Sequence, residues 1–225
     1  MITANKNFSI IFVLLFMTVC VGACSRQASS RGPAMDREVS VSILPLRGDQ
    51  AGQDLNKVGQ LYFVGGVELK SPDKRFGGFS GMAISPGGDK LWLVSDKGNW
   101  LSASLSLDAS GLPLSLARVR IQPLFQPDGA FVKGKAQSDA EELVVAPDGS
   151  MLVAFERRHR LLVYPRARNP LAGMPRLLKL PPWLVNQGAN RGAEAMTYLK
   201  DGRLLVVAEG GGGKETPAAI WDGSS

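Results

Sequence analysis

Two glutamates, Glu141 and Glu156, stand at the outer ends of two short apolar runs. The runs, LVVA and MLVAF, are joined by the turn sequence Pro147-Asp148-Gly149. An Asp-Gly step between two apolar runs is a strong hairpin signal. The hairpin would bring both carboxylates to its open end, where neighbouring carboxylates can bind a cation such as Ca²⁺ through their oxygens.

The same arrangement of residues around a hairpin occurs three times in the chain. The copies follow one another at intervals of roughly 50–60 residues, slightly longer than the usual spacing of β-propeller blades. A repeated hairpin of this kind builds a series of sheets around a common site. The aligned positions form two columns, one of Ser80, Glu141 and Glu194 and the other of Asp96, Glu156 and Glu209.

The type of turn decides whether the two glutamates of one copy face each other. Asp148-Gly149 lies midway between Glu141 and Glu156. A two-residue turn would place the two glutamates directly opposite, about 4.5–5.5 Å apart at Cβ, where like charges are destabilising. A bound cation, an arginine or a retained proton would relieve that repulsion. Pro147 instead favours a type I turn with a bulge at Gly149, which would shift the register by one residue and separate the pair.

In the third copy of the hairpin the two glutamates are also equally far from the turn, but the turn has no proline. Asp201-Gly202 lies midway between Glu194 and Glu209, and Lys200 replaces the proline. We therefore expect this copy to be the clearer case of a directly opposed pair. The alternative for both copies is that the acids end their strands in water or in single ion pairs.

A basic cluster follows the second copy of the hairpin directly. Arg157, Arg158 and His159, together with Arg191 further on, are candidates to bind an anionic group such as phosphate through arginine forks. The alternative is that the cluster neutralises the neighbouring glutamates. Because His159 is the only histidine and no G-x-S-x-G sequence occurs, a serine nucleophile has little support.

Composition sets limits on what the chain can be. It has 225 residues, of which 44% are hydrophobic and 20% charged, as in an ordinary globular domain. The net charge of +6 suits either an anionic ligand or a generally basic, solvated surface. No run of basic residues with interleaved aromatics indicates nucleic-acid binding.

The N-terminus has the pattern of a targeting segment. A lysine precedes the apolar stretch Phe8–Val19, and the small residues Val-Gly-Ala-Cys follow, ending at Cys24. We expect residues 1–23 to be a lipoprotein-type signal peptide, Cys24 to be the lipidated residue, and residues 24–38 to be a flexible linker. The small residues resemble a bacterial lipobox, and by resemblance to such lipoproteins Ser25 after the cysteine favours the outer membrane, with the domain facing the periplasm. Cleavage after Ala23 without lipidation, or an uncleaved anchor, are the alternatives.

Both cysteines lie in this N-terminal segment, so the remaining chain has no disulfide, no cysteine nucleophile and no cysteine-ligated metal. In that remainder, alternating apolar patterns predict strands and no helix of ordinary length. We expect an all-β, β-propeller-like domain over residues 39–225, with about four blades and an incomplete C-terminal end. The expected strands lie in residues 39–46, 58–69, 79–85, 91–96, 100–107, 117–124, 161–164, 176–180 and 218–221, and two more lie in each of the second and third hairpin copies, within residues 139–160 and 192–213.

Five short motifs occur along the chain in a fixed order. They are FGGFSG from Phe76, VSDKG from Val94, DAE from Asp139, FERRHR from Phe155 and GAEA from Gly192. In this order they resemble a bacterial phytase-like family, described by the phrase "esterase-like activity of phytase", and the resemblance covers residues 58–220. It implies a β-propeller-like, exported domain and Ca²⁺-dependent hydrolysis of phosphate esters.

Three functions are compatible with the sequence. The first is a hydrolase of phosphate or other esters in which Ca²⁺ activates water, Glu141 and Glu194 are catalytic, and Asp96, Glu156 and Glu209 hold the metal. The second is a non-catalytic envelope lipoprotein that binds a ligand or a partner. The third is a lactonase-like sugar hydrolase, for which Asn190 is a further ligand. The hydrolase functions predict that the acids converge, whereas the second predicts that they scatter.

Overall fold

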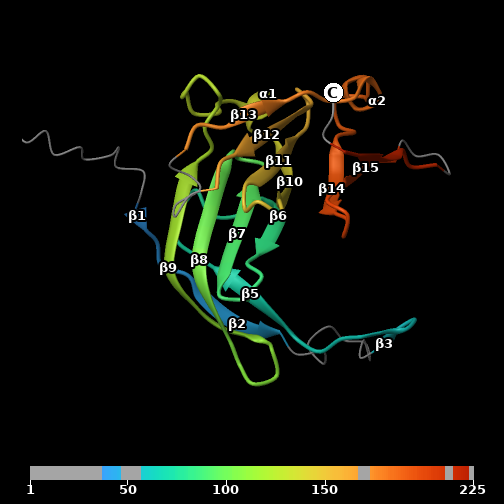
Figure 1. Cartoon of the computed structure of the whole chain (residues 1–225). Coiled ribbons are helices and arrows are strands. Elements are labelled where there is room, and N and C mark those ends of the chain that lie inside the picture. Colours follow the sequence, from blue (N-terminus) through green and yellow to red (C-terminus); the bar gives the residue numbers. More distant parts are fainter. Residues whose placement is uncertain (1–36, 47–56, 167–172, 211–214, 223–225) are drawn as a thin grey trace, which may run out of the picture. The chain divides into compact units, whose positions relative to one another are not determined.

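Strands dominate the computed structural model, which describes residues 37–46, 57–166, 173–210 and 215–222 (Figure 1). Within these residues there are sixteen strands in five sheets, and each of the two helices has only four residues. None of the five sheets closes on itself. The all-β prediction is confirmed, and the fold is β-propeller-like, because consecutive antiparallel sheets follow one another along the chain as blades.

Blade 1 is the sheet of β6 (Phe79–Ile84), β7 (Lys90–Ser95), β8 (Asn99–Leu107) and β9 (Pro113–Pro123), with β1 (Arg37–Glu38) added at the edge of β9. Blade 2 contains β10 (Ala140–Val145), β11 (Met151–Phe155), β12 (Arg160–Tyr164) and β13 (Arg176–Leu178). Blade 3 contains β14 (Ala193–Tyr198), β15 (Leu204–Ala208) and β16 (Ala218–Trp221).

The remaining elements are small. The strand β2 (Ser42–Leu46) pairs with β5 (Gly66–Lys70), and β3 (Lys57–Val58) forms a hairpin with β4 (Leu61–Tyr62). The helix α1 (Lys135–Ser138) precedes blade 2, and α2 (Pro182–Val185) lies between blades 2 and 3. Residues 58–69, which we expected to form one interrupted strand, therefore belong to three strands. No helix in the described residues is long and apolar enough to span a membrane.

Blade 2 is buried on both faces. Along β11, Met151, Val153 and Phe155 pack against blade 1, whereas Leu152 and Ala154 pack against blade 3. Because successive side chains of a strand point to opposite faces, both alternating sets must be apolar. This requirement explains the unbroken run MLVAF.

Two aromatic side chains join blade 1 to blade 2. The rings of Trp100 and Tyr164 meet edge to face, with their centroids 4.9 Å apart, and both side chains are fully buried. The Tyr164 hydroxyl donates a hydrogen bond of 2.7 Å to the carbonyl of Phe125. The first strands of the blades, β6, β10 and β14, also lie side by side, with β10 between the other two.

The type I turn with a bulge at Gly149, which Pro147 favours, is confirmed, whereas the two-residue turn expected in the third copy is wrong. In blade 2 the Gly149 amide donates to the Ala146 carbonyl at 2.8 Å, and in blade 3 the Gly202 amide donates to the Leu199 carbonyl at 3.0 Å. Both glycines have positive φ, 82° and 85°, a region that glycine adopts without steric cost. These are type I turns followed by a glycine bulge, so replacing proline by Lys200 does not change the turn.

Candidate functional site

The first strand of each blade contains one β-bulge at the same place. The register of pairing shifts across Ser80 in blade 1, Glu141 in blade 2 and Glu194 in blade 3. A bulge inserts an extra residue and re-aims its side chain. The one-residue shift made by the turns would separate Glu141 from Glu156, but the bulge brings the two carboxylates back together.

The second column of aligned residues is held by an equivalent backbone bond in each blade. The amides of Asp96, Glu156 and Glu209 donate to the carbonyls of Gly78, Asp139 and Gly192, at 2.8, 2.9 and 3.0 Å. Each of these acids therefore starts at the same height, immediately beyond the last residue of its strand. The alignment of the three copies is thus also an alignment of backbone geometry.

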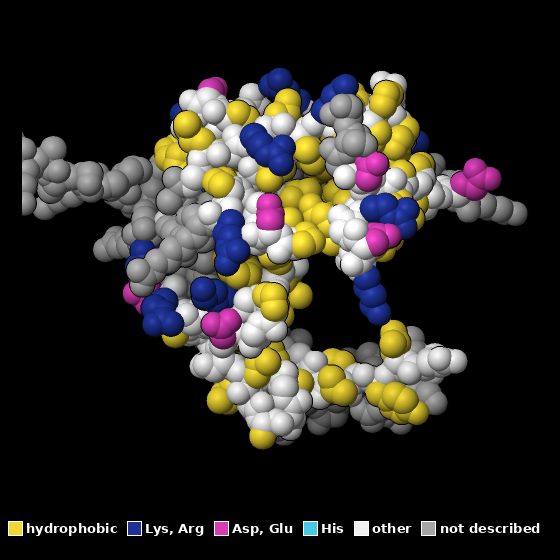
Figure 2. All heavy atoms as spheres, in the orientation of Figure 1, with side chains coloured by type: hydrophobic (Ala, Val, Ile, Leu, Met, Phe, Trp, Pro, Cys, Tyr) yellow, Lys and Arg dark blue, Asp and Glu magenta, His cyan; other side chains and the backbone are white. Residues whose placement is uncertain are grey.

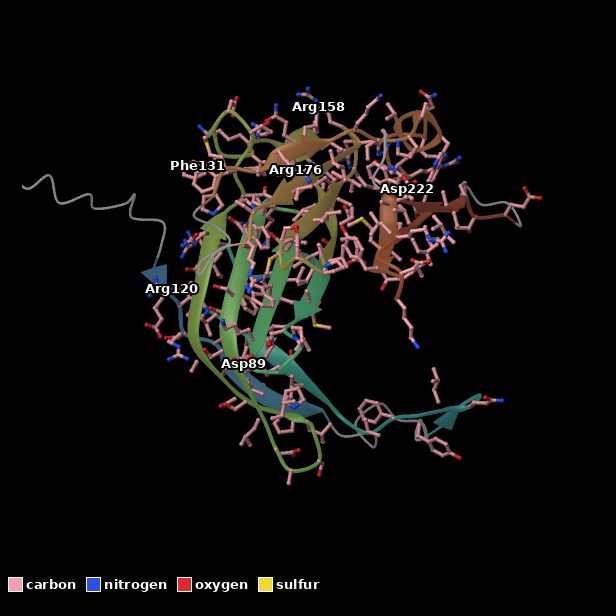
Figure 3. The ribbon with its side chains drawn as sticks, viewed as in Figure 1. Asp89, Arg120, Phe131, Arg158, Arg176 and Asp222 are labelled. Carbon is pink, nitrogen blue, oxygen red and sulfur yellow. The ribbon has the colours of Figure 1, made fainter. Side chains whose placement is uncertain are left out.

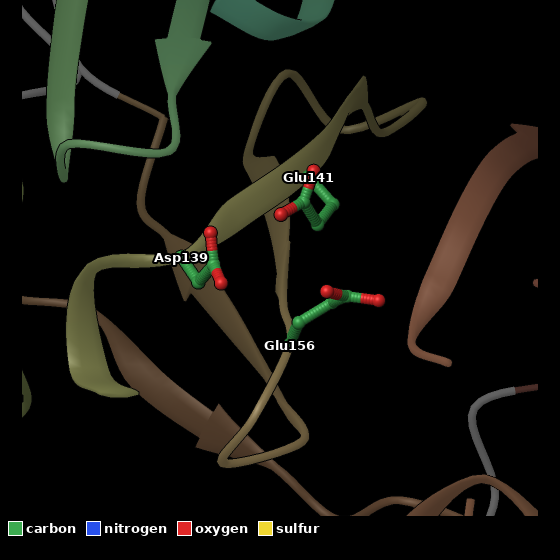
Figure 4. A group of neighbouring side chains, drawn as sticks. All are labelled: Asp139, Glu141 and Glu156. Carbon is green, nitrogen blue, oxygen red and sulfur yellow. The ribbon is translucent and has the colours of Figure 1, made fainter. Parts of the chain in front are cut away.

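Five carboxyl groups form what we call the acidic cluster. Oxygens of Asp139, Glu141 and Glu156 lie within 4.8 Å of one another, and so do oxygens of Glu156, Glu194 and Glu209. Glu156 belongs to both groups and joins them. Figure 4 shows the first group, with Asp139 and Glu141 at the start of β10 and Glu156 at the end of β11.

Asp139 is the most deeply buried member, with 2% of its surface exposed. Its Oδ1 accepts a hydrogen bond from Lys135 Nζ at 2.5 Å, and its Oδ2 accepts one from Arg157 Nε at 2.7 Å. Burial alone would raise the pKa of Asp139, but its hydrogen bonds, led by the one from Lys135, outweigh that and hold the pKa below its ordinary value. Asp139 is therefore an anion in a doubly paired, buried position.

The two glutamates on the bulges, Glu141 and Glu194, have raised pKa values, in contrast to Asp139. Burial, a hydrogen bond to Asp139 and the nearby negative charges raise the pKa of Glu141 to about 8. Burial, a hydrogen bond to Glu156 and the charges around it raise the pKa of Glu194 to about 7. At neutral pH, Glu141 therefore holds a proton, and Glu194 is near the midpoint of its titration.

Glu156 is fixed by the backbone of blade 3. Only 8% of its surface is exposed, and its Oε1 accepts a hydrogen bond of 2.9 Å from the Gly192 amide. A Cβ atom on residue 192 would lie 2.7 Å from Glu156 Cγ, closer than real contacts allow. Glycine is required there because the backbone must approach the glutamate side chain.

Asp96 and Ser80, the blade 1 members of the two columns, lie outside the acidic cluster. Asp96 Oδ2 pairs with Lys135 at 3.1 Å, so Lys135 bridges Asp96 and Asp139 between the two blades. The hydroxyl of Ser80 donates to the Ala140 carbonyl across to blade 2. The structure thus brings together Glu141, Glu156, Glu194 and Glu209, and links Asp96 to them only through Lys135.

The four basic residues expected to bind an anion do not share one environment. Arg157 is paired with Asp139, with its backbone at a φ of 57°. His159 Nε2 lies 3.0 Å from the Gly188 carbonyl, so this nitrogen donates and the histidine anchors the β11–β12 turn. Arg158 and Arg191 are exposed. Cys24, the expected lipidation site, lies outside the described residues.

Two residues of this site did not stand out in the sequence. Asp139 precedes the bulged Glu141 by two positions, where the other two blades have glycine, and that difference between copies was an available signal. Lys135, four residues before Asp139 on the short helix α1, had no comparable signal, because nothing in the pattern places it between two blades.

Residues 74–224 match the phytase-like family described as "Esterase-like activity of phytase". The chain belongs to this family. The matched segment includes all of blades 2 and 3, blade 1 except β1, and every member of the acidic cluster. The resemblance predicted from the short motifs is therefore confirmed.

The phytase-like chain has distant structural neighbours. One is virginiamycin B lyase from Staphylococcus aureus, at 12% identity and a TM-score of 0.36, covering 80% of this chain and 45% of the lyase. A streptogramin B lyase structure matches at 16% identity and a TM-score of 0.36, covering 64% of this chain and 40% of that one. The chain thus spans less than half the length of either neighbour. A search of curated proteins finds no match.

Proposed function

We propose that this phytase-like chain is a Ca²⁺-dependent hydrolase of phosphate or other esters and that it acts at the acidic cluster. The observation that supports this most directly is the sharing of Glu156 between two groups of three carboxyl groups. A purely structural ion pair does not need five carboxyl groups from two blades. Such a set is expensive to bring together, since like charges at this distance repel.

The donor set fits calcium. Ca²⁺ binds six to eight oxygen ligands and accepts irregular geometry. Glu156, Glu194 and Glu209 would hold the ion, with Glu141 and Asp139 completing the negative surroundings. A bound Ca²⁺ would polarise the ester and offset the developing negative charge. In its absence, protons on Glu141 and Glu194 reduce the repulsion, which agrees with the raised pKa of both carboxyl groups.

Glu141 is the residue best suited to transfer a proton. Its pKa of about 8 keeps it protonated at neutral pH, and it lies beside Asp139, which stays ionised. A carboxyl group in this state can donate its proton to the leaving oxygen of an ester. Arg158 and Arg191 are exposed near the same end of blade 2 and would attract an anionic substrate.

A non-catalytic role has one observation in its favour. Lys135 and Arg157 already neutralise Asp139, as expected where acids only join two blades. This alternative is the second function compatible with the sequence, a non-catalytic envelope lipoprotein that binds a ligand or a partner. The lactonase-like alternative has less support, because Asn190 is exposed in a turn and is not a neighbour in either of the two sets of three acidic residues.

We also propose that the protein is exported and anchored through a lipid on Cys24, with the domain facing the periplasm. The support is the order of charged, apolar and small residues before that cysteine. The substrate would then be a small anionic or ester compound of that compartment. Labelling with a radioactive fatty acid would test the anchor, and a Cys24→Ser variant that keeps the label would refute it.

The decisive experiment combines calorimetric titration of Ca²⁺ with hydrolysis of 4-nitrophenyl phosphate and 4-nitrophenyl acetate. We expect wild type to bind Ca²⁺ and to lose hydrolysis in EDTA, and Glu141→Gln/Glu194→Gln to lose both. Glu68→Gln, an exposed residue paired with Lys70, is the matched control. Absence of Ca²⁺ binding in wild type refutes the proposal, and binding without hydrolysis favours the non-catalytic alternative.

A further inference from the structure

A second charged region lies at the other end of the β10–β11 hairpin, in a cleft between blade 1 and blade 2. It is lined by residues of β7, β8 and β9 and by the β10–β11 turn, and its volume is about 930 Å³. That volume is typical of sites for small molecules. The acidic cluster lies at the start of β10 and the cleft at its end, about 17 Å along the strand.

All the charged side chains that line this cleft are basic. They are Lys90, Arg118, Arg120 and Arg166. Within the described residues, no ion pair joins Lys90, Arg118 or Arg166 to a carboxylate. Figure 2 shows Lys and Arg side chains spread over the face in view with Asp and Glu side chains among them, and Figure 3 labels Arg120 on blade 1.

The acids next to the lining residues in sequence are held in their own turns. Asp89, beside Lys90, accepts a hydrogen bond of 2.6 Å from the Ser85 hydroxyl. Asp148, beside Gly149, accepts bonds of 2.8 and 2.7 Å from the amide and hydroxyl of Ser150. The charge of Asp89 interacts with that of Lys90, but neither carboxylate lines the cleft, and all the charged groups in its lining are basic.

Arg118 shows that this arrangement has a structural cost. It has a φ of 51°, a left-handed conformation that side-chain-bearing residues rarely adopt, and it lies where the β8–β9 register shifts, between the pairs Ser102–Arg120 and Ser104–Ala117. Its Nε and Nη2 both donate to the Ser104 hydroxyl, at 3.1 and 2.7 Å. Because a guanidinium has five N–H donors, three stay available while the side chain is held in place.

The same cleft has one aromatic side chain in its lining. Trp92, from β7, is half-buried and packs against the core that includes Met151, which is itself only 2% exposed. The exposed part of an indole packs well against a flat, weakly polar ring. The cleft therefore combines basic side chains, hydroxyl groups and part of an aromatic side chain.

We propose that this cleft is a binding site for a small organic phosphate, a dianionic head group attached to a flat apolar portion. The arginine forks of Arg118 and Arg166 and the ammonium of Lys90 bind the oxyanion, since guanidinium groups match phosphate geometry. Trp92 packs against the apolar portion. The site is separate from the acidic cluster and needs no calcium.

Calorimetric titration of the full-length chain with phenylphosphonate in EDTA tests the proposal, with methylphosphonate as the smaller probe. Phosphonates resist hydrolysis, and EDTA keeps the acidic cluster out of the measurement. We expect saturable binding of one phenylphosphonate per chain, and weaker binding of methylphosphonate. Arg118→Gln should weaken both by about tenfold, as expected for loss of a charge-assisted contact.

Two further variants distinguish a built site from general charge. Trp92→Leu should weaken phenylphosphonate several-fold and leave methylphosphonate unchanged. Arg203→Gln removes one exposed charge elsewhere, from a pair with Asp201, and should change neither affinity. Because Arg118→Gln could disturb the bulge, Arg166→Gln, which has no strained backbone, should repeat its effect.

Three outcomes overturn the proposal. The first is an absence of saturable binding by wild type. The second is an equal loss of affinity in Arg203→Gln and Arg166→Gln, which would mean that only net charge matters. The third is binding to vesicles of anionic lipid without binding to phenylphosphonate, which would assign this face to a membrane surface instead.

Discussion

Blade 1 and blade 2 use one backbone device for different purposes. Each has a bulge in its first strand, and in each the residue after the second strand donates its amide to the residue two positions before the bulge. In blade 1 the bulged residue is Ser80, which bonds to the backbone of blade 2. In blade 2 it is Glu141, which joins the acidic cluster.

This difference shows that the scaffold does not by itself determine the chemistry. The bulge aims one side chain at the neighbouring blade whatever its type, and the residue type then decides between a link and a functional group. The position two residues before the bulge differs in the same way, because it is Gly78 in blade 1 and the charged Asp139 in blade 2. We therefore expect the carboxylates of blade 2 to behave differently from their counterparts in blade 1.

The largest effect on stability is expected at Asp139. Asp139→Asn removes a buried charge that is paired with Lys135 and Arg157, and should lower the free energy of unfolding by about 3 kcal/mol. Asp96→Asn, its neighbour across Lys135, has a side chain 40% exposed and should cost less than about 1 kcal/mol. Urea unfolding at pH 7 measures both, and equal losses would contradict the contrast between the blades.

Calcium affinity should depend on Glu156 more than on any blade 1 residue. Glu156→Gln keeps an oxygen that accepts the hydrogen bond from the Gly192 amide, but it removes the charge that the two sets of three carboxyl groups share. Ca²⁺ affinity should therefore fall about 100-fold. Asp96→Asn should change it less than about threefold. Calorimetry reports both values. A large loss in Asp96→Asn with none in Glu156→Gln would place the ion elsewhere.

The stability of the calcium-free protein should fall as pH rises. The pKa of Glu141 is about 8 in the folded state against its ordinary value of 4.5, so the folded state retains a proton that the unfolded chain releases. Stability is therefore lost between about pH 4.5 and pH 8, by an amount on the order of 1–2 kcal/mol for a half-exposed group. Thermal melts in EDTA should show this decline.

Glu141→Gln provides the control for that pH dependence. Because glutamine does not titrate in this range, its melting temperature should fall less between pH 5 and pH 8 than that of wild type. Ser80→Gln, at the same place in blade 1, should leave the decline unchanged. A decline that is identical in wild type and Glu141→Gln would show that other groups cause it.

The smallest effect is expected for the link made by blade 1. Ser80→Ala removes the hydrogen bond to the Ala140 carbonyl and should lower the free energy of unfolding by about 1 kcal/mol. Ser115→Ala, at an exposed position of β9, is the matched control and should be neutral. Urea unfolding with Ca²⁺ absent measures the difference, and a neutral Ser80→Ala would mean that the link does not stabilise the pair of blades.

The sequence alone determined the repeat, because each hairpin is a local pattern. The apolar runs, the Pro147-Asp148-Gly149 turn and the two columns of acids all depend on residues close together in the chain. The type I turn expected from Pro147 is confirmed in its own copy, where it shifts the register. Lys200 does not produce the two-residue turn expected in the third copy, because a type I turn with a glycine bulge accepts most residues at that place.

Only the tertiary structure decided which residues meet between blades. The bulges at Glu141 and Glu194, the sharing of Glu156 and the bridging by Lys135 all depend on how one sheet approaches the next. The cleft between blades 1 and 2 likewise joins Arg118 of blade 1 to Arg166 after blade 2. Such contacts join residues far apart in the chain, and a local pattern specifies a hairpin but not the face that the next hairpin presents to it.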